Sequence, residues 1–172
     1  MSHFDEVPRE RSSTVGLAIS DVRFTDQRGV EVDAERETSF AVARFDVAEL
    51  EAGSIMVKDN SGPFDVHINI EGSRERPVIS LLFKNAADEV LADKRIEGEG
   101  FHSALNNYQE SVDDFFKAVR GATKISAAQA DENRRSHHNN TARELADLLA
   151  PDIRLTHDAA REFVGLIRIA LG

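Results

Sequence analysis

The amino-acid sequence predicts one α+β domain, in which an antiparallel sheet of three or four strands carries three C-terminal helices packed on one face. Two observations predict this fold class. Over residues 64–70, apolar side chains recur at every second position, as in a half-buried strand, and two further strand-like segments follow before residue 97. From Phe101 onward they recur three or four positions apart, as in amphipathic helices. We expect the domain to span 14–172, after a loose polar tail at 1–13.

The predicted strands follow one another as an antiparallel meander. The alternation of apolar residues predicts a first strand over 15–19 and a second over 64–70. Two more strands are expected over 78–84 and 89–96, separated by turns rich in Gly, Asn and Asp. Residues 34–52 fit either a helix or a strand, and their Ala and Glu content favours a helix.

The predicted helices begin where the period of the apolar residues changes. A long helix is expected over 101–119, and its apolar stripe, which extends to Val119, is interpreted as core. Capping patterns predict a second helix from Ser126, a short third helix from Thr141 and a last helix capped by Thr156.

Composition excludes several classes of protein. Apolar residues make up 41% of the chain and charged residues 30%, which is the balance of a folded globular protein. The chain has no cysteine, which excludes thiolate catalysis, iron–sulfur clusters and cysteine-ligated zinc. Without a signal-like leader or an apolar run of about 20 residues, we expect a cytoplasmic protein that does not enter a membrane.

The charge is distributed unevenly. The formal net charge is −10, which argues against DNA as a partner. Residues 117–143 nevertheless hold six cations and only two anions. This basic segment is where RNA or a phosphorylated ligand could bind.

One cluster in this segment is the candidate anion site. If the segment is helical, Arg134 and Arg135 lie about one turn from His138 and Asn139, and a helix starting at Thr141 would add backbone N–H groups. Guanidinium, imidazole and amide groups on one face bind phosphate or carboxylate. In the alternative, the arginines pair with acids and fix the junction between the second and third C-terminal helices. The residues that would support either arrangement are Asp131, Glu132, Asp158 and Arg161.

No catalytic residue, metal site or cofactor is identified. His137, His138 and His157 could ligate a metal, but adjacent histidines on a helix point about 100° apart. We therefore expect no native metal and no cofactor, and whether the chain is an enzyme stays open.

Four stretches resemble one protein family. They are the Gly-Pro-Phe at 62–64, the Phe-Phe-Lys-Ala-Val-Arg-Gly-Ala-Thr at 115–123, the Asp-x-x-Arg-Arg-x-x-His-Asn at 131–139 and the Asp-x-Ala-Arg segment that continues to Leu-Ile over 158–167. Together they resemble an uncharacterised bacterial protein family, UPF0262, best over 108–172. The resemblance implies an α+β fold and supplies candidate positions, but it implies no activity.

The function we expect is that of a non-catalytic binding or regulatory protein with a protein partner. The alternative is an enzyme or ligand-binding domain that uses Arg134, Arg135, His138 and Asn139 on a phosphorylated small molecule or RNA. An open concave site would favour this alternative. We also expect self-association, because the predicted sheet has at least one unprotected edge and the strand at 78–83 is apolar on both faces.

Overall fold

A computed structural model describes residues 16–29 and 31–172, and its fold class is α+β, as predicted. The expected tail at 1–13 lies outside the described residues. In chain order the elements are β1 (Ile19–Asp26), α2 (Ala34–Ala48), β2 (Ile55–Val57), β3 (Phe64–Gly72), β4 (Pro77–Lys84), β5 (Val90–Ile96), α3 (Glu99–Val119), α4 (Ala127–Leu149), β6 (Ile153–Leu155) and α5 (His157–Leu171).

The main sheet has the strand order β1-β3-β4-β5. The meander of β3, β4 and β5 is antiparallel, as predicted. The prediction of a wholly antiparallel sheet is wrong at β1, which runs parallel to β3, so the sheet is mixed. A parallel neighbour needs a long crossover, and α2 with β2 provides it between the two strands. The strand at 78–83 is β4, an interior strand, and the edges of this sheet are β1 and β5.

The start of β3 is joined closely to the start of β1. The backbone N–H of Phe64 donates to the carbonyl oxygen of Ala18 at 2.8 Å. Gly62 makes this approach possible, because a Cβ at that position would lie 2.7 Å from the same oxygen and its φ is +93°. Glycine alone adopts such a backbone conformation without strain.

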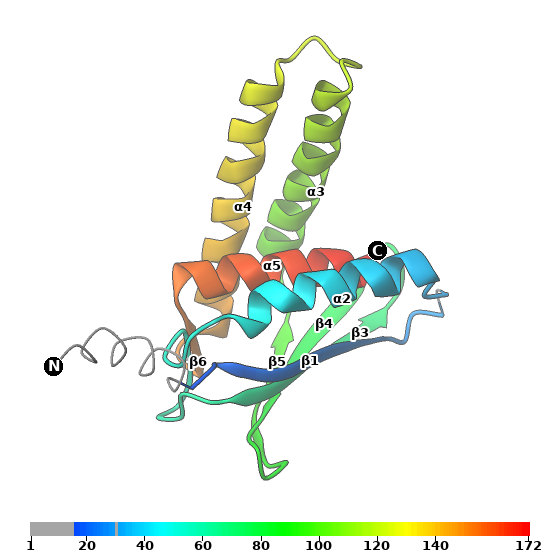
Figure 1. Ribbon diagram of the computed structural model, residues 1–172. Helices are drawn as coiled ribbons and strands as arrows, with labels where there is room; N and C mark the ends of the chain where they lie inside the picture. The colour runs from blue at the N-terminus through cyan, green and yellow to red at the C-terminus, as the bar shows by residue number, and fades with distance from the viewer. Residues whose placement is uncertain (1–15, 30) are drawn as a thin grey trace, which may run out of the picture.

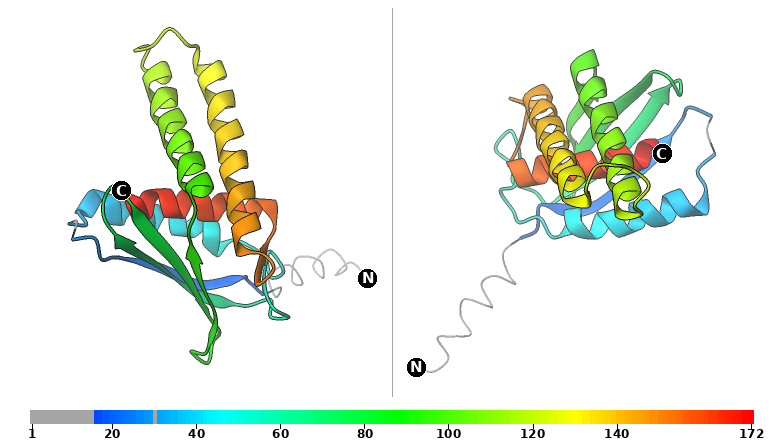
Figure 2. Two further views of the ribbon diagram at one scale, coloured as in Figure 1. Left: turned by 180° about the vertical axis from the view of Figure 1, so that it is seen from behind. Right: turned by 90° about the horizontal axis from the view of Figure 1, so that it is seen from above.

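The helices form two groups. α2, favoured by the composition of 34–52, and α5 both lie on one face of the sheet, whereas α3 and α4 project away from it as a hairpin (Figures 1 and 2). The prediction of three C-terminal helices packed on one face is therefore wrong for α3 and α4. The apolar face of α5 fills the core, where Phe163 lies 6.1 Å from the ring of Phe83 in β4.

The predicted break at Thr141 does not exist, because α4 is one continuous helix. The caps predicted at Ser126 and Thr156 are confirmed: their hydroxyls accept from the N–H groups of Gln129 and Ala159. The hydroxyl of Thr141 instead donates to the carbonyl oxygens of His137, one turn back, and Ala104 in α3. A buried Thr in this position fastens the hairpin and does not begin a helix. Sequence patterns also missed the small antiparallel sheet of β2 and β6.

A buried ion cluster closes the end of α5. The Asp26 carboxylate has no exposed surface and pairs with Arg28 and Arg36 at 2.7 Å each. Both guanidinium groups also donate to the last carbonyl oxygens of α5, at Leu171 and Ala170. Burial raises the pKa of Asp26, but the hydrogen bonds from the two arginines outweigh it and hold that pKa far below its ordinary value.

Candidate functional site

The four residues of the predicted anion site do not share one face of α4. Arg134 and His138 are directed toward α3 and α5, where they contact Phe115 and Tyr108. Arg135 and Asn139 line the outer side of the same helix. Neighbouring helix positions diverge by about 100°, so each arginine shares a face with the residue four positions on. The structure therefore brings Arg134 and His138 together on one side of α4 and Arg135 and Asn139 on another.

His138 is held in a neutral state on the inner side. Its ring stacks on Tyr108, its Nε2 donates to the carbonyl oxygen of Arg161 at 2.8 Å, and its Nδ1 accepts from the Arg161 guanidinium at 3.3 Å. Burial lowers the pKa of His138 to about 4; the carbonyl acts in the opposite direction, and the cations of Arg161, Arg134 and Arg168 lower it further. A neutral imidazole with both nitrogens paired adds no positive charge for an anion.

The two arginines of the motif share one carboxylate. Arg134 donates to Asp131 from both Nε and Nη2, and it covers the ring of Phe115 at 5.2 Å. Arg135 Nε lies 3.3 Å from the other oxygen of Asp131, but its side chain is 60% exposed. The hydrogen bond from Arg134 lowers the pKa of Asp131. Asp131 is thus the acid that pairs with the arginines, whereas Asp158 forms no ion pair within 16–29 and 31–172.

The outer side of α4 carries a shallow polar hollow of about 510 Å³. Asn139 lies at its edge and also contacts His157 Nε2 through its Oδ1 at 3.3 Å. This surface retains two cations of the predicted basic segment, but it also includes an acid. The residues that line it are Glu132, Arg135, Ser136, Asn139 and Arg143.

The three histidines considered as metal ligands do not converge. His138 is bonded to Arg161, and His157 contacts Asn139. Over the described part of the chain, no group of three or more His, Asp or Glu side chains is placed to hold a metal ion.

The end of the α3–α4 hairpin exposes an apolar patch. Phe116, Val119 and Ile125 are between 44% and 59% exposed. The prediction that the apolar stripe of 101–119 is entirely core is therefore wrong in its last turn, because α3 has extended beyond the body that would cover it (Figure 1). Cations alternate with these apolar side chains. We name this surface the hairpin tip, and it consists of Phe116, Lys117, Val119, Arg120, Lys124 and Ile125.

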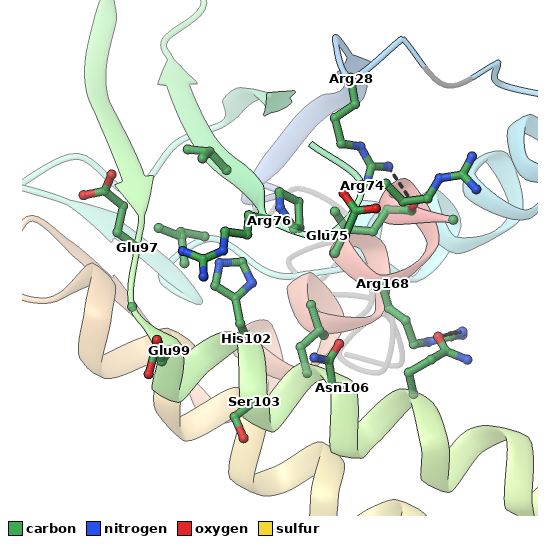
Figure 3. A pocket seen from close by; sticks show the side chains of 18 of the residues that line it. Arg28, Arg74, Glu75, Arg76, Glu97, Glu99, His102, Ser103, Asn106 and Arg168 are labelled. Carbon is green, nitrogen blue, oxygen red and sulfur yellow. Dashed lines mark hydrogen bonds between the residues drawn. The ribbon is translucent and has the colours of Figure 1, made fainter. Parts of the chain in front are cut away.

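A groove lies where the start of α3, the β3–β4 turn and the end of α5 meet. Its volume is about 810 Å³. Figure 3 shows Arg76 beside His102 on one side and Arg168 on another. Its floor is partly apolar, and three acids, Glu75, Glu97 and Glu99, also line it. These residues lie far apart in sequence and form no motif, so sequence reasoning missed the groove.

Arg168 is the cation that α5 contributes to this groove. Its Nη1 donates to Gln109 Oε1 at 3.2 Å, and its guanidinium carbon lies 5.8 Å from the centre of the Tyr108 ring. Its Nε is buried without a hydrogen-bond partner in the described residues. A neighbouring hollow of about 630 Å³ shares Arg168, Arg28 and Arg74 with the groove. The cations therefore border a continuous polar surface around the end of α5.

Across residues 16–29 and 31–172, no helix combines the length and the apolar character needed to cross a bilayer.

Comparison with known proteins finds one family. Residues 17–171 match the model of the family described as "Uncharacterised protein family (UPF0262)". A UPF0262 protein of Rhodospirillum rubrum is 27% identical over 161 residues, which are 92% of each chain. A UPF0262 protein of Bradyrhizobium diazoefficiens is 26% identical over 141 residues, which cover 82% of this chain and 81% of the relative. No solved structure matches.

Proposed function

This chain belongs to the UPF0262 family of uncharacterised proteins, and we propose that it is a non-catalytic binding protein that docks on a protein partner through its hairpin tip. The observation that carries this proposal is the apolar patch at the end of the projecting α3–α4 hairpin. Exposed apolar patches rimmed by polar side chains mark interaction sites on folded proteins.

The positive charges of the tip indicate that the partner surface is acidic. Lys117, Arg120 and Lys124 lie among the exposed apolar side chains, and none of them pairs with an acid in the part of the chain that the structure describes. A partner surface that buries the apolar residues would therefore carry carboxylates around them. Aromatic side chains and arginine, which the tip contains as Phe116 and Arg120, are also enriched in protein interfaces.

The geometry of α4 favours a protein over a phosphate as the ligand of the basic segment. Of its six cations, three belong to the tip, while Arg134 and Arg135 share Asp131 further along α4. His138 is neutral and fully paired, so it is a poor base and a poor anion ligand. These features weaken the alternative in which Arg134, Arg135, His138 and Asn139 act on RNA or a phosphorylated molecule.

Capture from a bacterial lysate tests the proposal. The bait is the tagged full chain, compared with Phe116→Ser/Val119→Ser at the tip and with Val90→Ser, an equally exposed apolar residue on β5. We expect the wild type and the β5 control to retain the same protein, with or without RNase, and the tip variant to lose it. Loss of the captured protein on RNase treatment, or equal capture by all three baits, would overturn the proposal.

The groove supports a second candidate function, the binding of a small phosphate-containing anion. Arg168 offers a buried, unpartnered Nε, and Arg74 and Arg76 border the same space. Titration calorimetry with inorganic pyrophosphate tests it. We expect Arg168→Gln to abolish the heat of binding and Arg135→Gln, on the outer side of α4, to leave it unchanged. No heat with the wild type, or equal heats with both variants, would exclude this function.

A further inference from the structure

We infer that the hairpin tip of one copy docks on a second copy of this chain, at a surface formed by the outer side of α2 and the start of α5. This inference rests on the proposed role of the tip and names its partner. The receiving surface, which we name the α2 surface, consists of Glu35, Thr38, Val42, Phe45, Asp46, Glu49, Asp158 and Glu162.

The apolar part of the α2 surface is unusually exposed. Val42 and Phe45 are 62% and 71% exposed, although α2 buries Phe40 and Val47 on its other side. Residues at 35, 38, 42, 45 and 49 follow helical spacing and so form one outward stripe with a carboxylate at each end. The stripe therefore presents a small apolar centre inside an acidic rim.

The start of α5 adds further carboxylates beside this stripe. Burial raises the pKa of Glu162; the carboxylates of Asp46 and Asp158 raise it further, and Arg161 acts in the opposite direction. Three acids from α2 and α5 therefore repel one another at this place. A cation brought in by another molecule would relieve that repulsion.

The hairpin tip and the α2 surface complement each other in charge, and both expose apolar side chains. Residues 115–126, which contain the tip, include three cations and no acid. The α2 surface combines Val42 and Phe45 with acids along both helices. Docking would bury apolar side chains on both surfaces and bring opposite charges together around them.

The contact must form between copies. The hairpin extends away from the layer that contains α2 and α5, so its tip stands clear of the α2 surface of the same copy (Figures 1 and 2). Each copy carries one tip and one α2 surface, so a two-fold axis would allow two identical contacts in one dimer. A stable interface buries about 1,200–2,000 Å² of surface. Two tip contacts come closer to this area than one contact does.

Charge exchange between two variants tests this inference. The tip variant is Lys117→Glu/Arg120→Glu/Lys124→Glu, and the α2 variant is Asp46→Lys/Glu49→Lys. Sedimentation equilibrium of the full chain should show dimers for the wild type and monomers for each variant alone. An equimolar mixture should again form dimers, because each tip then faces an α2 surface of opposite charge. The control, Glu71→Lys/Asp93→Lys, reverses acids on β3 and β5 and should dimerise as the wild type does.

The outcomes separate this inference from the proposed function. A wild type that stays monomeric at every concentration, or two variants that do not restore dimers on mixing, would overturn self-docking. Phe45→Ser, which changes no charge, should also weaken the dimer at least tenfold, and an unchanged dimer would overturn the assigned surface. The lysate experiment still tests the tip in each of these cases, because it detects partners other than this chain.

Discussion

The imidazole of His138 lies parallel to the phenol ring of Tyr108, with 4.6 Å between ring centres and 11° between ring planes. The stack joins α4 to α3 near the middle of both helices, and Arg168 of α5 approaches the same phenol ring at 5.8 Å. Three helices therefore meet at a tyrosine and a neutral histidine.

This stack predicts that the free energy of unfolding falls between pH 6.5 and 4. In the unfolded chain His138 takes up a proton near its ordinary pKa of 6.5, whereas in the folded chain it does so only near 4. The unfolded state binds more protons in this window, so stability is present above pH 6.5 and is lost as the pH falls. Denaturant titrations at several pH values measure the slope.

Two variants test whether His138 causes this dependence of stability on pH. His138→Gln should reduce it, while the matched control, His137→Gln, should keep it. Some slope should persist in both, because burial also lowers the pKa of His67, on β3. Equal slopes for the wild type and His138→Gln would contradict this prediction.

The buried ion cluster predicts a large cost for Asp26→Asn. The change removes the one carboxylate with which, among the residues that the structure describes, both Arg28 and Arg36 pair, and leaves two buried guanidinium groups without that negative charge beside them. We expect the free energy of unfolding to fall by about 3–5 kcal/mol. Asp21→Asn, whose side chain is half exposed and lies 3.8 Å from Arg44, should cost less than about 1 kcal/mol. Chemical denaturation measures both variants. If Asp26→Asn and Asp21→Asn lose similar free energies of unfolding, the buried ion pairs contribute no more than an exposed one.

The division of the predicted site over two sides of α4 predicts unequal effects of its arginines. Arg135→Ala should cost less than about 1 kcal/mol, since its side chain is 60% exposed. Arg134→Ala should cost more, because it also loses its contact with the Phe115 ring. Thermal unfolding of the two variants ranks them, and the reverse order would contradict the assignment of faces.

The hydroxyl of Thr141 predicts a smaller but measurable effect. Thr141→Val keeps the shape of a buried side chain but loses the bonds to the carbonyl oxygens of Ala104 and His137. We expect a loss of about 1 kcal/mol, measured by denaturant titration. Ser136→Ala, which removes an exposed hydroxyl from the same helix, is the control and should cause no loss. If Thr141→Val behaves like the control, the hydroxyl does not fasten the hairpin.

Local patterns predicted the elements better than their arrangement. The alternation at 64–70 and the caps at Ser126 and Thr156 depend on neighbouring residues, and all were confirmed. The parallel pairing of β1 was not predictable in this way, because it depends on contacts across the whole α2 crossover. The capping pattern at Thr141 was misleading, since a buried carbonyl of α3 is available to the same hydroxyl.

In the candidate site, too, only the local contacts were predictable from the sequence. The pairing of Arg134 and Arg135 with Asp131 was among the predicted alternatives, because it needs only helical spacing. The stack of His138 on Tyr108, the groove beside Arg168 and the exposed end of α3 depend on how distant elements meet. Periodicity cannot tell a stripe that faces a core from one that extends past it.

The central position of α5 determines the order in which the molecule can be completed during synthesis. This helix contacts α2, the sheet and both hairpin helices, yet it follows all of them in the chain. Until it has left the ribosome, the apolar faces of β3 and β4 have no permanent cover, and Arg28 and Arg36 lack the backbone oxygens that they bind at the end of α5. A nascent chain stalled before residue 157 should therefore expose the future core and be a good substrate for chaperones and proteases.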